Sequence, residues 1–330
     1  MIDFVCCLIN AGHHAIPIYT ALPEKYKGTL YCNDEVADYA RDYGVQNIKS
    51  YKGTGTIAND LMKYKRLTVV NSFGDNRRAL LGKRKTVFGE HGVGYTFDNG
   101  HESYAGSKTG RSNVVMFLCQ NKHVQKMNQS VFPNIPCPII GIPKMDAWTG
   151  REFTINKADP LVCISFHWDC FVHPFTRSCW RDYLPHLKSI RRTFRTVGHA
   201  HPRHYDKFAD RFRRNKIKMI PDLRDVMETV DIYVNDSSST IFEFAYLNKP
   251  VVLMNSDLYP RDKNLNARFW QHNYVGVNVD DPKTIVDKIR MAIDDPPEQQ
   301  KLRKQAIEAV FTYTDGHCAE RAAKEIISLL

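Results

Sequence analysis

The chain has 330 residues, of which 43% are hydrophobic and 25% charged, the composition of a soluble globular protein with room for two domains. Its net charge of +10 and pI near 9.1 predict partners of negative charge, such as nucleotide phosphates, anionic lipid or nucleic acid, without choosing among them. No apolar run approaches the ~20 residues that span a bilayer, and no basic segment precedes the first apolar run, which argues against a signal peptide.

The cysteines point to a reducing compartment. There are nine, an odd number, and no CxxC pair occurs. This pattern argues against a disulfide framework and against a structural zinc site. We therefore expect a cytoplasmic protein, with peripheral contact at the inner face of the membrane left open.

The first half alternates short apolar segments with helical patterns. Strands are predicted over residues 4–9, 29–32, 47–51, 67–72, 85–88, 114–119 and 137–142. Helices are predicted over residues 33–44, 57–66 and 121–132, and residues 13–22 form a loop or a short helix. The helix at 33–44 is the best marked, because Asn33 can cap its start and Gly44 can end it.

A polar stretch that ends in Pro160 interrupts the pattern, and we predict a linker over residues 148–160. The alternation then restarts. Strands are predicted over residues 161–166, 194–197, 216–221, 231–234, 251–254 and 275–279. Helices are predicted over residues 181–190, 204–215, 223–230, 241–247, 282–293, 298–311 and 317–330.

This order of elements predicts an α/β protein with two Rossmann-like domains and parallel sheets. We expect an N-terminal domain over residues 1–147, a C-terminal domain over 161–315, and a helix over 316–330 that packs back across the domains. Ligands of open α/β sheets bind at the carboxyl ends of strands, so we expect a site in a cleft between the domains. No GxGxxG or GxxxxGK[ST] motif supports an NAD enzyme or a P-loop protein.

A run of small hydroxyl side chains follows the predicted strand at 231–234. It consists of Ser237, Ser238, Ser239 and Thr240. Asp236 or a serine can cap the helix that begins here. The run is either a simple capping turn or a cradle for the phosphates of a nucleotide-activated donor, since a helix N-terminus with free N–H groups favours anions.

Two more strand ends carry histidines with chemically useful neighbours. Glu90, His91 and Gly92 follow the strand at 85–88, where the histidine can serve as a general base or be incidental to a turn. His199, His201 and Arg203 lie at the end of the strand at 194–197, where cationic groups suit a departing phosphate; a weak metal pair or a solvated basic loop is the competing interpretation.

The loop after the strand at 161–166 contains His167, Trp168 and Asp169. Trp168 can stack on a base, but a core position is the more ordinary role for a tryptophan. Residues 188–218 are strongly basic, and two further basic runs lie at 63–66 and 83–85. A solvated charged face explains them most simply, and a surface for nucleic acid or anionic lipid remains open.

Taken in order, several segments resemble the CDP-glycerol glycerophosphotransferase family of teichoic-acid and capsule synthesis, which has a GT-B fold. The segments are HGVGYTF (91–97), GIPKMD (141–146), CISFHWD (163–169), GHAHPR (198–203), the long block 222–252 around NDSSSTIFEF, and YTDGHCAERAAKEI (313–326). The block 222–252 is the most specific of them.

The resemblance implies roles for individual residues. His91 would be the base that deprotonates the acceptor hydroxyl, with Glu90 and Gly92 on the acceptor side. His201 would lie against the donor pyrophosphate. The donor nucleotide and phosphates would be held by Ser237, Ser238, Ser239, Thr240, Glu243, His167 and Arg203. A GT-B site usually needs no metal, and we expect no cofactor beyond the nucleotide-activated donor, either CDP- or UDP-linked.

We therefore predict a transferase that moves a glycosyl or glycerophosphoryl group from such a donor to an acceptor hydroxyl. The acceptor would be a cell-surface polymer or a lipid-linked precursor. A rival hypothesis keeps the fold and adds a sugar to a hydroxylated DNA base that is flipped from the stack. An epimerase-like enzyme that needs no acceptor is a third hypothesis. A fourth is a non-catalytic nucleic-acid-binding protein on the same scaffold.

Overall fold

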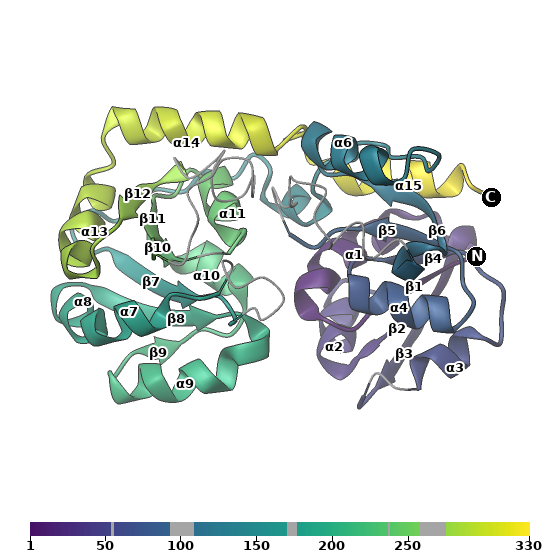
Figure 1. The fold of residues 1–330 in the computed structure, drawn as a ribbon, viewed down its shortest axis with the longest axis horizontal. Helices are drawn as coiled ribbons and strands as arrows, with labels where there is room; N and C mark the ends of the chain where they lie inside the picture. Colours follow the sequence, from purple (N-terminus) through teal and green to yellow (C-terminus); the bar gives the residue numbers. More distant parts are fainter. Residues whose placement is uncertain (54–55, 93–108, 170–176, 237, 258–274) are drawn as a thin grey trace. The chain divides into compact units, whose positions relative to one another are not determined.

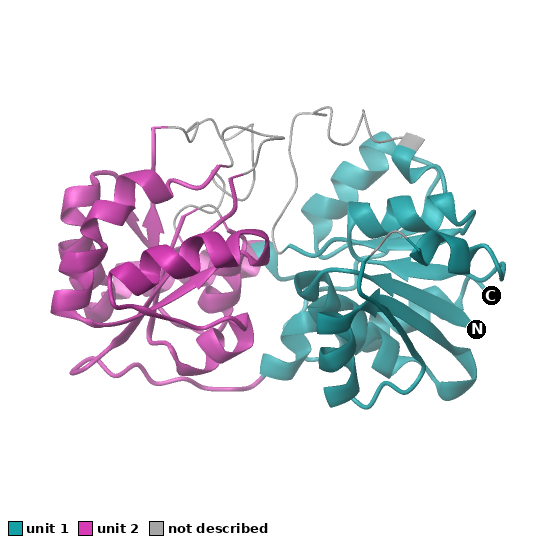
Figure 2. Ribbon diagram, turned by 90° about the horizontal axis from the view of Figure 1, so that it is seen from below, with its two compact units in different colours: residues 1–149, 310–330 teal, residues 150–309 magenta. Residues whose placement is uncertain are grey.

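The computed structural model describes residues 1–53, 56–92, 109–169, 177–236, 238–257 and 275–330. It forms two compact units, shown in separate colours in Figure 2. Unit 1 contains residues 1–149 and 310–330, and unit 2 contains residues 150–309. Between residues 149 and 160, where the linker was predicted, there is no helix or strand.

Unit 1 is a six-stranded parallel sheet in the order β3-β2-β1-β4-β5-β6, flanked by helices (Figure 1). Its strands are β1 (Ile2–Cys6), β2 (Lys27–Asn33), β3 (Ile48–Tyr51), β4 (Thr68–Val70), β5 (Thr86–Gly89) and β6 (Val114–Leu118). Its α-helices are α1 (Ile9–Ala21), α2 (Asp34–Asp42), α3 (Ile57–Leu61), α4 (Phe73–Leu81), α6 (Lys122–Val131) and α15 (Cys318–Ile327). Its 3-10 helices are η1 (Glu24–Tyr26), η2 (Thr109–Arg111) and η3 (Pro143–Trp148).

Both faces of this sheet are buried, which explains why its strands read as continuous apolar runs. Successive side chains of a strand point to opposite faces. Phe4 of β1 therefore packs in the layer with α1, α2 and α15, whereas its neighbour Val5 packs in the layer with α3, α4 and α6.

The C-terminal helix α15 packs on α1 and η3 of unit 1. The Asp146 carboxylate accepts hydrogen bonds from the backbone N–H groups of Cys318 and Ala319, at 3.1 and 2.7 Å, and so caps the first turn of α15. Gly141 has φ +84°, and a Cβ there would lie 2.5 Å from Cys318 Sγ. The glycine and aspartate of the GIPKMD segment thus hold the end of the chain in place.

Unit 2 repeats the architecture, with parallel strands in the order β12-β11-β10-β7-β8-β9. They are β7 (Leu161–Phe166), β8 (Arg195–Ala200), β9 (Lys218–Met219), β10 (Ile232–Asn235), β11 (Val251–Met254) and β12 (Val277–Val279). The α-helices are α7 (Trp180–Tyr183), α8 (Leu187–Thr193), α9 (Tyr205–Arg214), α10 (Leu223–Thr229), α11 (Thr240–Tyr246), α13 (Ile285–Asp294) and α14 (Pro297–Val310). The 3-10 helices are η5 (Leu184–His186), η6 (Pro202–His204) and η8 (Pro282–Thr284).

Counted from its own first strand, each sheet has the strand order 3-2-1-4-5-6. The order reverses direction between the first and fourth strands, β1 and β4 in unit 1 and β7 and β10 in unit 2. Ligands of such sheets bind at the carboxyl ends of these strands. The predicted class, two Rossmann-like units with parallel sheets, is confirmed.

Several predicted elements differ from those observed. Residues 13–22 belong largely to the 13-residue helix α1, which tolerates Pro17 in its interior. The strand predicted at 137–142 is wrong, because only a single bridge between Cys119 and Ile139 forms there. The helix predicted over 57–66 ends at Leu61, and its basic second half forms the turn that leads into β4.

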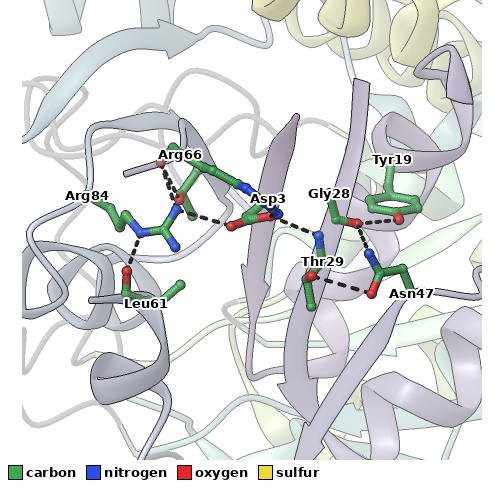
Figure 3. A network of polar contacts seen from close by, with 9 residues as sticks. Asp3, Tyr19, Gly28, Thr29, Asn47, Leu61, Arg66 and Arg84 are labelled. Carbon is green, nitrogen blue, oxygen red and sulfur yellow. Dashed lines mark hydrogen bonds and ion pairs between the residues drawn. The ribbon is translucent and has the colours of Figure 1, made fainter. Parts of the chain in front are cut away.

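A buried ion pair stabilises unit 1 at the amino ends of its central strands (Figure 3). Asp3 and Arg84 are both buried, and their side chains meet at 3.1 Å. Arg84 also donates to the carbonyls of Leu61 and Arg66, and Asp3 accepts from the N–H of Thr29 at 2.9 Å. The pair therefore joins β1, β2 and the turns before β4 and β5.

The eight cysteines that the structure describes are buried, and no disulfide joins any two of them. Within the same residues, no helix is long and apolar enough to cross a membrane.

Candidate active site

The hydroxyl-rich loop of unit 2 is organised by the last residue of β10. The Asn235 amide donates to the Ser165 carbonyl of the neighbouring strand β7, at 3.1 Å. Its side-chain oxygen accepts the N–H of Ser238, at 3.0 Å. Ser238 Oγ in turn accepts the N–H of Thr240, at 3.3 Å. Ser238 therefore satisfies the N–H of the first residue of α11, whereas Ser239, at the N-cap position, makes no side-chain cap.

The hydroxyl groups of this loop belong to one chain of hydrogen bonds that runs from the partly exposed Ser238 to the buried Tyr233. Thr240 Oγ1 lies 2.9 Å from Ser238 Oγ and 2.8 Å from the hydroxyl of the buried Tyr233. Ser238 and Ser239 are partly exposed, so both can meet a ligand. Ser237 lies outside the described residues.

Asp236 is not the helix cap. Its carboxylate accepts the N–H of His167 at 2.9 Å and the hydroxyl of Ser178 at 2.5 Å. Because His167 directly follows β7, this contact ties the loop after β7 to the end of β10. Asp236 thus fixes the position of His167 relative to the serines.

Glu243 lies on α11 and is buried, with 1% of its surface exposed. Its helix packs against the sheet through Phe244, whose ring stacks on Tyr233 with centroids 3.9 Å apart. Glu243 is therefore a buried residue of the first turn of the helix that follows the serine loop.

Four of the predicted residues gather at the ends of β7 and β8. The rings of His167 and His201 meet edge to face with centroids 5.2 Å apart. The guanidinium of Arg203 lies 4.7 Å from the centre of the Trp168 ring, a cation–π contact. Trp168 is partly exposed, so its assignment to the core is wrong. Two members of this His-Trp-His-Arg cluster, His167 and Trp168, belong to the loop after β7, which is joined to Asp236 through the N–H of His167.

His199 does not belong to this cluster. It lies inside β8, where its Nδ1 is 2.9 Å from the hydroxyl of Ser165. Burial lowers the pKa of His199 to about 4. The ring is therefore neutral at physiological pH, and its predicted part as a cationic group at the strand end is wrong.

In unit 1, Glu90 and His91 follow β5 at the carboxyl edge. The His91 Nδ1 atom lies 3.0 Å from the carbonyl of Asn71, the residue after β4. A carbonyl can only accept, so Nδ1 carries the proton and the neutral ring has its lone pair on Nε2. That tautomer is the one that a general base requires.

Three buried polar side chains surround the Glu90–His91 turn. Gln120, after β6, donates to the Glu90 carbonyl at 3.4 Å. His14, on α1, makes a hydrogen bond to the backbone of His91, and burial together with the nearby Lys144 and His91 lowers the pKa of His14 well below its ordinary value. The third is Asn71.

Each of these three side chains keeps one buried polar atom without a hydrogen-bond partner among the residues that the structure describes. The atoms are His14 Nε2, Asn71 Oδ1 and Gln120 Oε1. Such atoms are costly to bury unless a ligand or water satisfies them. The edge of unit 1 is thus equipped to accept hydrogen bonds from hydroxyl groups.

Sequence reasoning missed Asn71, Gln120, Asn235 and Ser178. Asn71, Gln120 and Asn235 are polar residues at or just after the end of an apolar strand. This pattern is visible in the sequence, most clearly for Asn235, which precedes the serines. Ser178 and His14 gave no such signal, since their partners are distant in the chain. Within the described residues, no group of three His, Cys, Asp or Glu side chains is placed to hold a metal ion.

The C-terminal part of the chain matches the model of a known protein family. Residues 191–328 match the model of the CDP-glycerol:poly(glycerophosphate) glycerophosphotransferase family. This range includes β8 with the His201 turn, and β10 with the serine loop. Curated protein sequences give no match to the chain.

Solved structures extend the similarity to both units. The wall teichoic acid polymerase TagF, in crystals soaked with CDPG, matches with TM-score 0.68 and 13% identity over 99% of this chain and 88% of that chain. MnaA of S. aureus with UDP matches with TM-score 0.64 and 13% identity over 100% and 97%. HepE of Anabaena with UDP-glucose matches with TM-score 0.59 and 12% identity over 100% and 99%.

These identities are low enough that the structural matches establish the fold alone. The fold is of the GT-B type, as predicted. The predicted resemblance is confirmed by the family model over residues 191–328, and the predicted enzyme class, a transferase, is confirmed with it.

Proposed function

We propose that this protein transfers a glycerophosphoryl group from CDP-glycerol, or a glycosyl group from a sugar nucleotide, to the hydroxyl of an acceptor. The observation that carries the proposal is that the His201 turn and the Ser238 loop both lie at the carboxyl edge of the unit 2 sheet, after the two strands that flank β7. Both lie in the range that matches the glycerophosphotransferase family. CDP-glycerol is the first choice of donor, because the family is named for it.

Unit 2 would hold the donor. His201 Nδ1 accepts the N–H of Arg203 at 3.2 Å, so the proton of its neutral ring lies on Nε2 and can be donated to a phosphate oxygen. Arg203 and the hydroxyls of Ser238 and Ser239 add further donors. Charge-assisted hydrogen bonds of this kind stabilise the negative charge that develops on the leaving nucleotide. The partly exposed Trp168, whose ring carries the guanidinium of Arg203, would contact the nucleoside.

Unit 1 would hold the acceptor and the base. The lone pair on His91 Nε2 takes the proton of the acceptor hydroxyl as its oxygen attacks. With CDP-glycerol, a bond forms from that oxygen to the phosphorus of the glycerophosphoryl group, and the anhydride bond breaks to release CMP. With a sugar nucleotide, the bond forms to the anomeric carbon and the nucleoside diphosphate leaves. No cofactor enters either reaction.

The buried acceptor atoms around the Glu90–His91 turn suit an acceptor with several hydroxyl groups. A hydroxyl that donates to Asn71 Oδ1 or Gln120 Oε1 would satisfy an atom that otherwise has no partner in the described structure. We propose a cell-surface polymer or a lipid-linked precursor as the natural acceptor.

A nucleotide-release assay tests the proposal. The full chain is incubated with CDP-glycerol, UDP-glucose or UDP-N-acetylglucosamine, each with and without a glycerol phosphate oligomer, and CMP, UDP and new phosphodiester or glycosidic bonds are measured. We expect acceptor-dependent CMP release with CDP-glycerol. Conversion of a UDP-sugar without acceptor would favour an epimerase. Transfer only to hydroxylated duplex DNA would favour a DNA-modifying enzyme, and failure to turn over any donor would overturn the proposal.

A further inference from the structure

The amino edge of the unit 1 sheet carries an exposed surface on which large apolar and cationic side chains alternate. Three of its apolar side chains are strongly exposed: Met62 (51%), Tyr64 (54%) and Leu81 (68%). Its exposed cations are Lys63, Lys65, Arg77, Lys83 and Lys85. We call these eight residues the amino-edge patch. They come from the two turns that lead into β4 and β5, and from the last turns of α4.

The two turns form one rigid surface because the buried Arg84 joins them. Its guanidinium donates to the carbonyls of Leu61 and Arg66, the residues that bracket the first turn, and pairs with Asp3 beneath (Figure 3). The backbone adds to this, since Thr68 N–H donates to the Lys85 carbonyl at 3.0 Å. The backbones of the two turns that carry the patch are therefore tied to each other.

The ends of α3 and α4 bring the apolar members together. A Cβ on Gly82 would lie 2.6 Å from Leu61 Cβ, so the turn after α4 touches the end of α3 directly. Leu81 and Met62 each lie one residue from that contact. Arg77 precedes Leu81 by four residues and so lies on the same face of α4.

The patch has little negative charge of its own. Asp60 is the acidic residue next to it, and its carboxylate is already shared by Lys63 and Lys49, each at 2.7 Å. Large apolar side chains are seldom exposed together on the surface of a soluble protein, and such a group indicates a site that binds another protein or a membrane. The sugar–phosphate backbone of nucleic acid can pair with the cations but gives methionine and leucine no apolar contact. A lipid bilayer satisfies both, because cations meet anionic headgroups and apolar side chains enter the acyl boundary.

We propose that the amino-edge patch is a membrane-binding surface that docks unit 1 on a bilayer rich in anionic phospholipid. The basic runs at 63–66 and 83–85 are then halves of one site. The surface lies at the edge of the sheet opposite to the His91 turn, so docking leaves the candidate acceptor edge uncovered. The inference stands whether or not the proposed reaction is correct.

The test is co-sedimentation of the full chain with vesicles of phosphatidylcholine alone and with 30% phosphatidylglycerol, at two salt concentrations. We expect binding to the anionic vesicles only, weakened by salt. The double variant Met62→Ser/Leu81→Ser should bind at least about tenfold more weakly, from lost insertion of two side chains. Lys63→Gln/Lys83→Gln should weaken binding about 25-fold, about fivefold for each cation.

The matched control is Arg213→Gln/Lys216→Gln, which removes two exposed cations from the basic surface of unit 2, and its binding should change less than about twofold. All six positions are exposed, so unchanged melting temperatures are expected. The proposal is overturned if the apolar pair binds like wild type, or if the control loses binding as strongly as the patch. It is also overturned if the patch variants abolish self-association or duplex DNA binding while wild type ignores vesicles.

Discussion

The two units of this protein share a strand order but differ in the chemistry of their carboxyl edges. In unit 2 the edge presents donors that suit anions: the ring of His201, the guanidinium of Arg203 and the hydroxyl of Ser238. In unit 1 the edge presents His91 with its lone pair on Nε2, surrounded by buried amide oxygens and the neutral ring of His14. The same scaffold thus carries an edge suited to phosphate and an edge suited to accepting a proton.

The difference arises from short segments after the strands. Unit 2 uses Asp236 as a brace between two strand-end loops, whereas unit 1 uses the backbone carbonyl of Asn71 to orient a single ring. In the proposed reaction, unit 2 would hold the donor and unit 1 would supply the base, so the two functions would be carried by separate sheets.

Each unit contains a buried arginine that clamps a carboxylate, and removing either should unfold its unit selectively. Arg84 pairs with Asp3 in unit 1, and Arg303 makes two bonds to Asp295 in unit 2, at 2.9 and 3.0 Å. Arg84→Met should lower the free energy of unfolding by about 3–5 kcal/mol, because the buried Asp3 carboxylate loses its buried partner and keeps Arg66, at 3.4 Å, as its ion-pair partner. Hydrogen exchange should show the loss in unit 1 for Arg84→Met and in unit 2 for Arg303→Met. Equal loss in both units for either variant would contradict independent cores.

His91→Ala should lower the turnover rate about a thousandfold, the scale of a lost general base, and leave donor affinity within about twofold. The measurement is kcat for CMP release beside the Kd for CDP. His186→Ala, on η5, is the control. A His91→Ala enzyme with near-normal kcat would remove the base from unit 1.

Acid should destabilise the fold through its buried neutral histidines. The pKa of His199 is lowered to about 4, so between about pH 6.5 and 4 the unfolded chain binds a proton that the folded chain does not. Stability contributed by this group is therefore present above about pH 6.5 and is lost as the pH falls toward 4, by up to about 3 kcal/mol. His14 acts in the same direction in unit 1.

Urea unfolding at neutral pH and about two pH units lower measures this effect. His199→Gln should reduce the difference between the two pH values, whereas His317→Gln, at an exposed position, should leave it unchanged. Identical pH dependence in wild type and His199→Gln would contradict the assignment.

Ser238→Ala should weaken donor binding about tenfold, because the variant removes a hydroxyl that we propose binds the phosphates and that accepts the N–H of Thr240. The readout is the increase in melting temperature that saturating CDP produces. Ser189→Ala, an exposed serine on α8, is the matched control. A full increase with Ser238→Ala would mean that the loop is only a capping turn.

The sequence predicted most strands and the serine loop, because apolar runs and clustered hydroxyl residues are local signals. It placed His199 wrongly, since whether a histidine at a strand end points into solvent or core depends on one residue of register, and β8 extends to Ala200. It left open whether Asp236 or a serine caps the helix, because the partner of the Asp236 carboxylate, the N–H of His167, is 69 residues away in the chain. His14 and Gln120 could not be found, because only the fold brings α1 and β6 to the His91 turn.

The most direct test of a divided site is calorimetric titration of CDP into His201→Ala and His91→Ala beside wild type. We predict that wild type and His91→Ala bind CDP with equal affinity, and that His201→Ala binds at least about tenfold more weakly, the scale of one lost charge-assisted hydrogen bond. Equal loss in both variants, or loss only in His91→Ala, would contradict the assignment of the donor to unit 2.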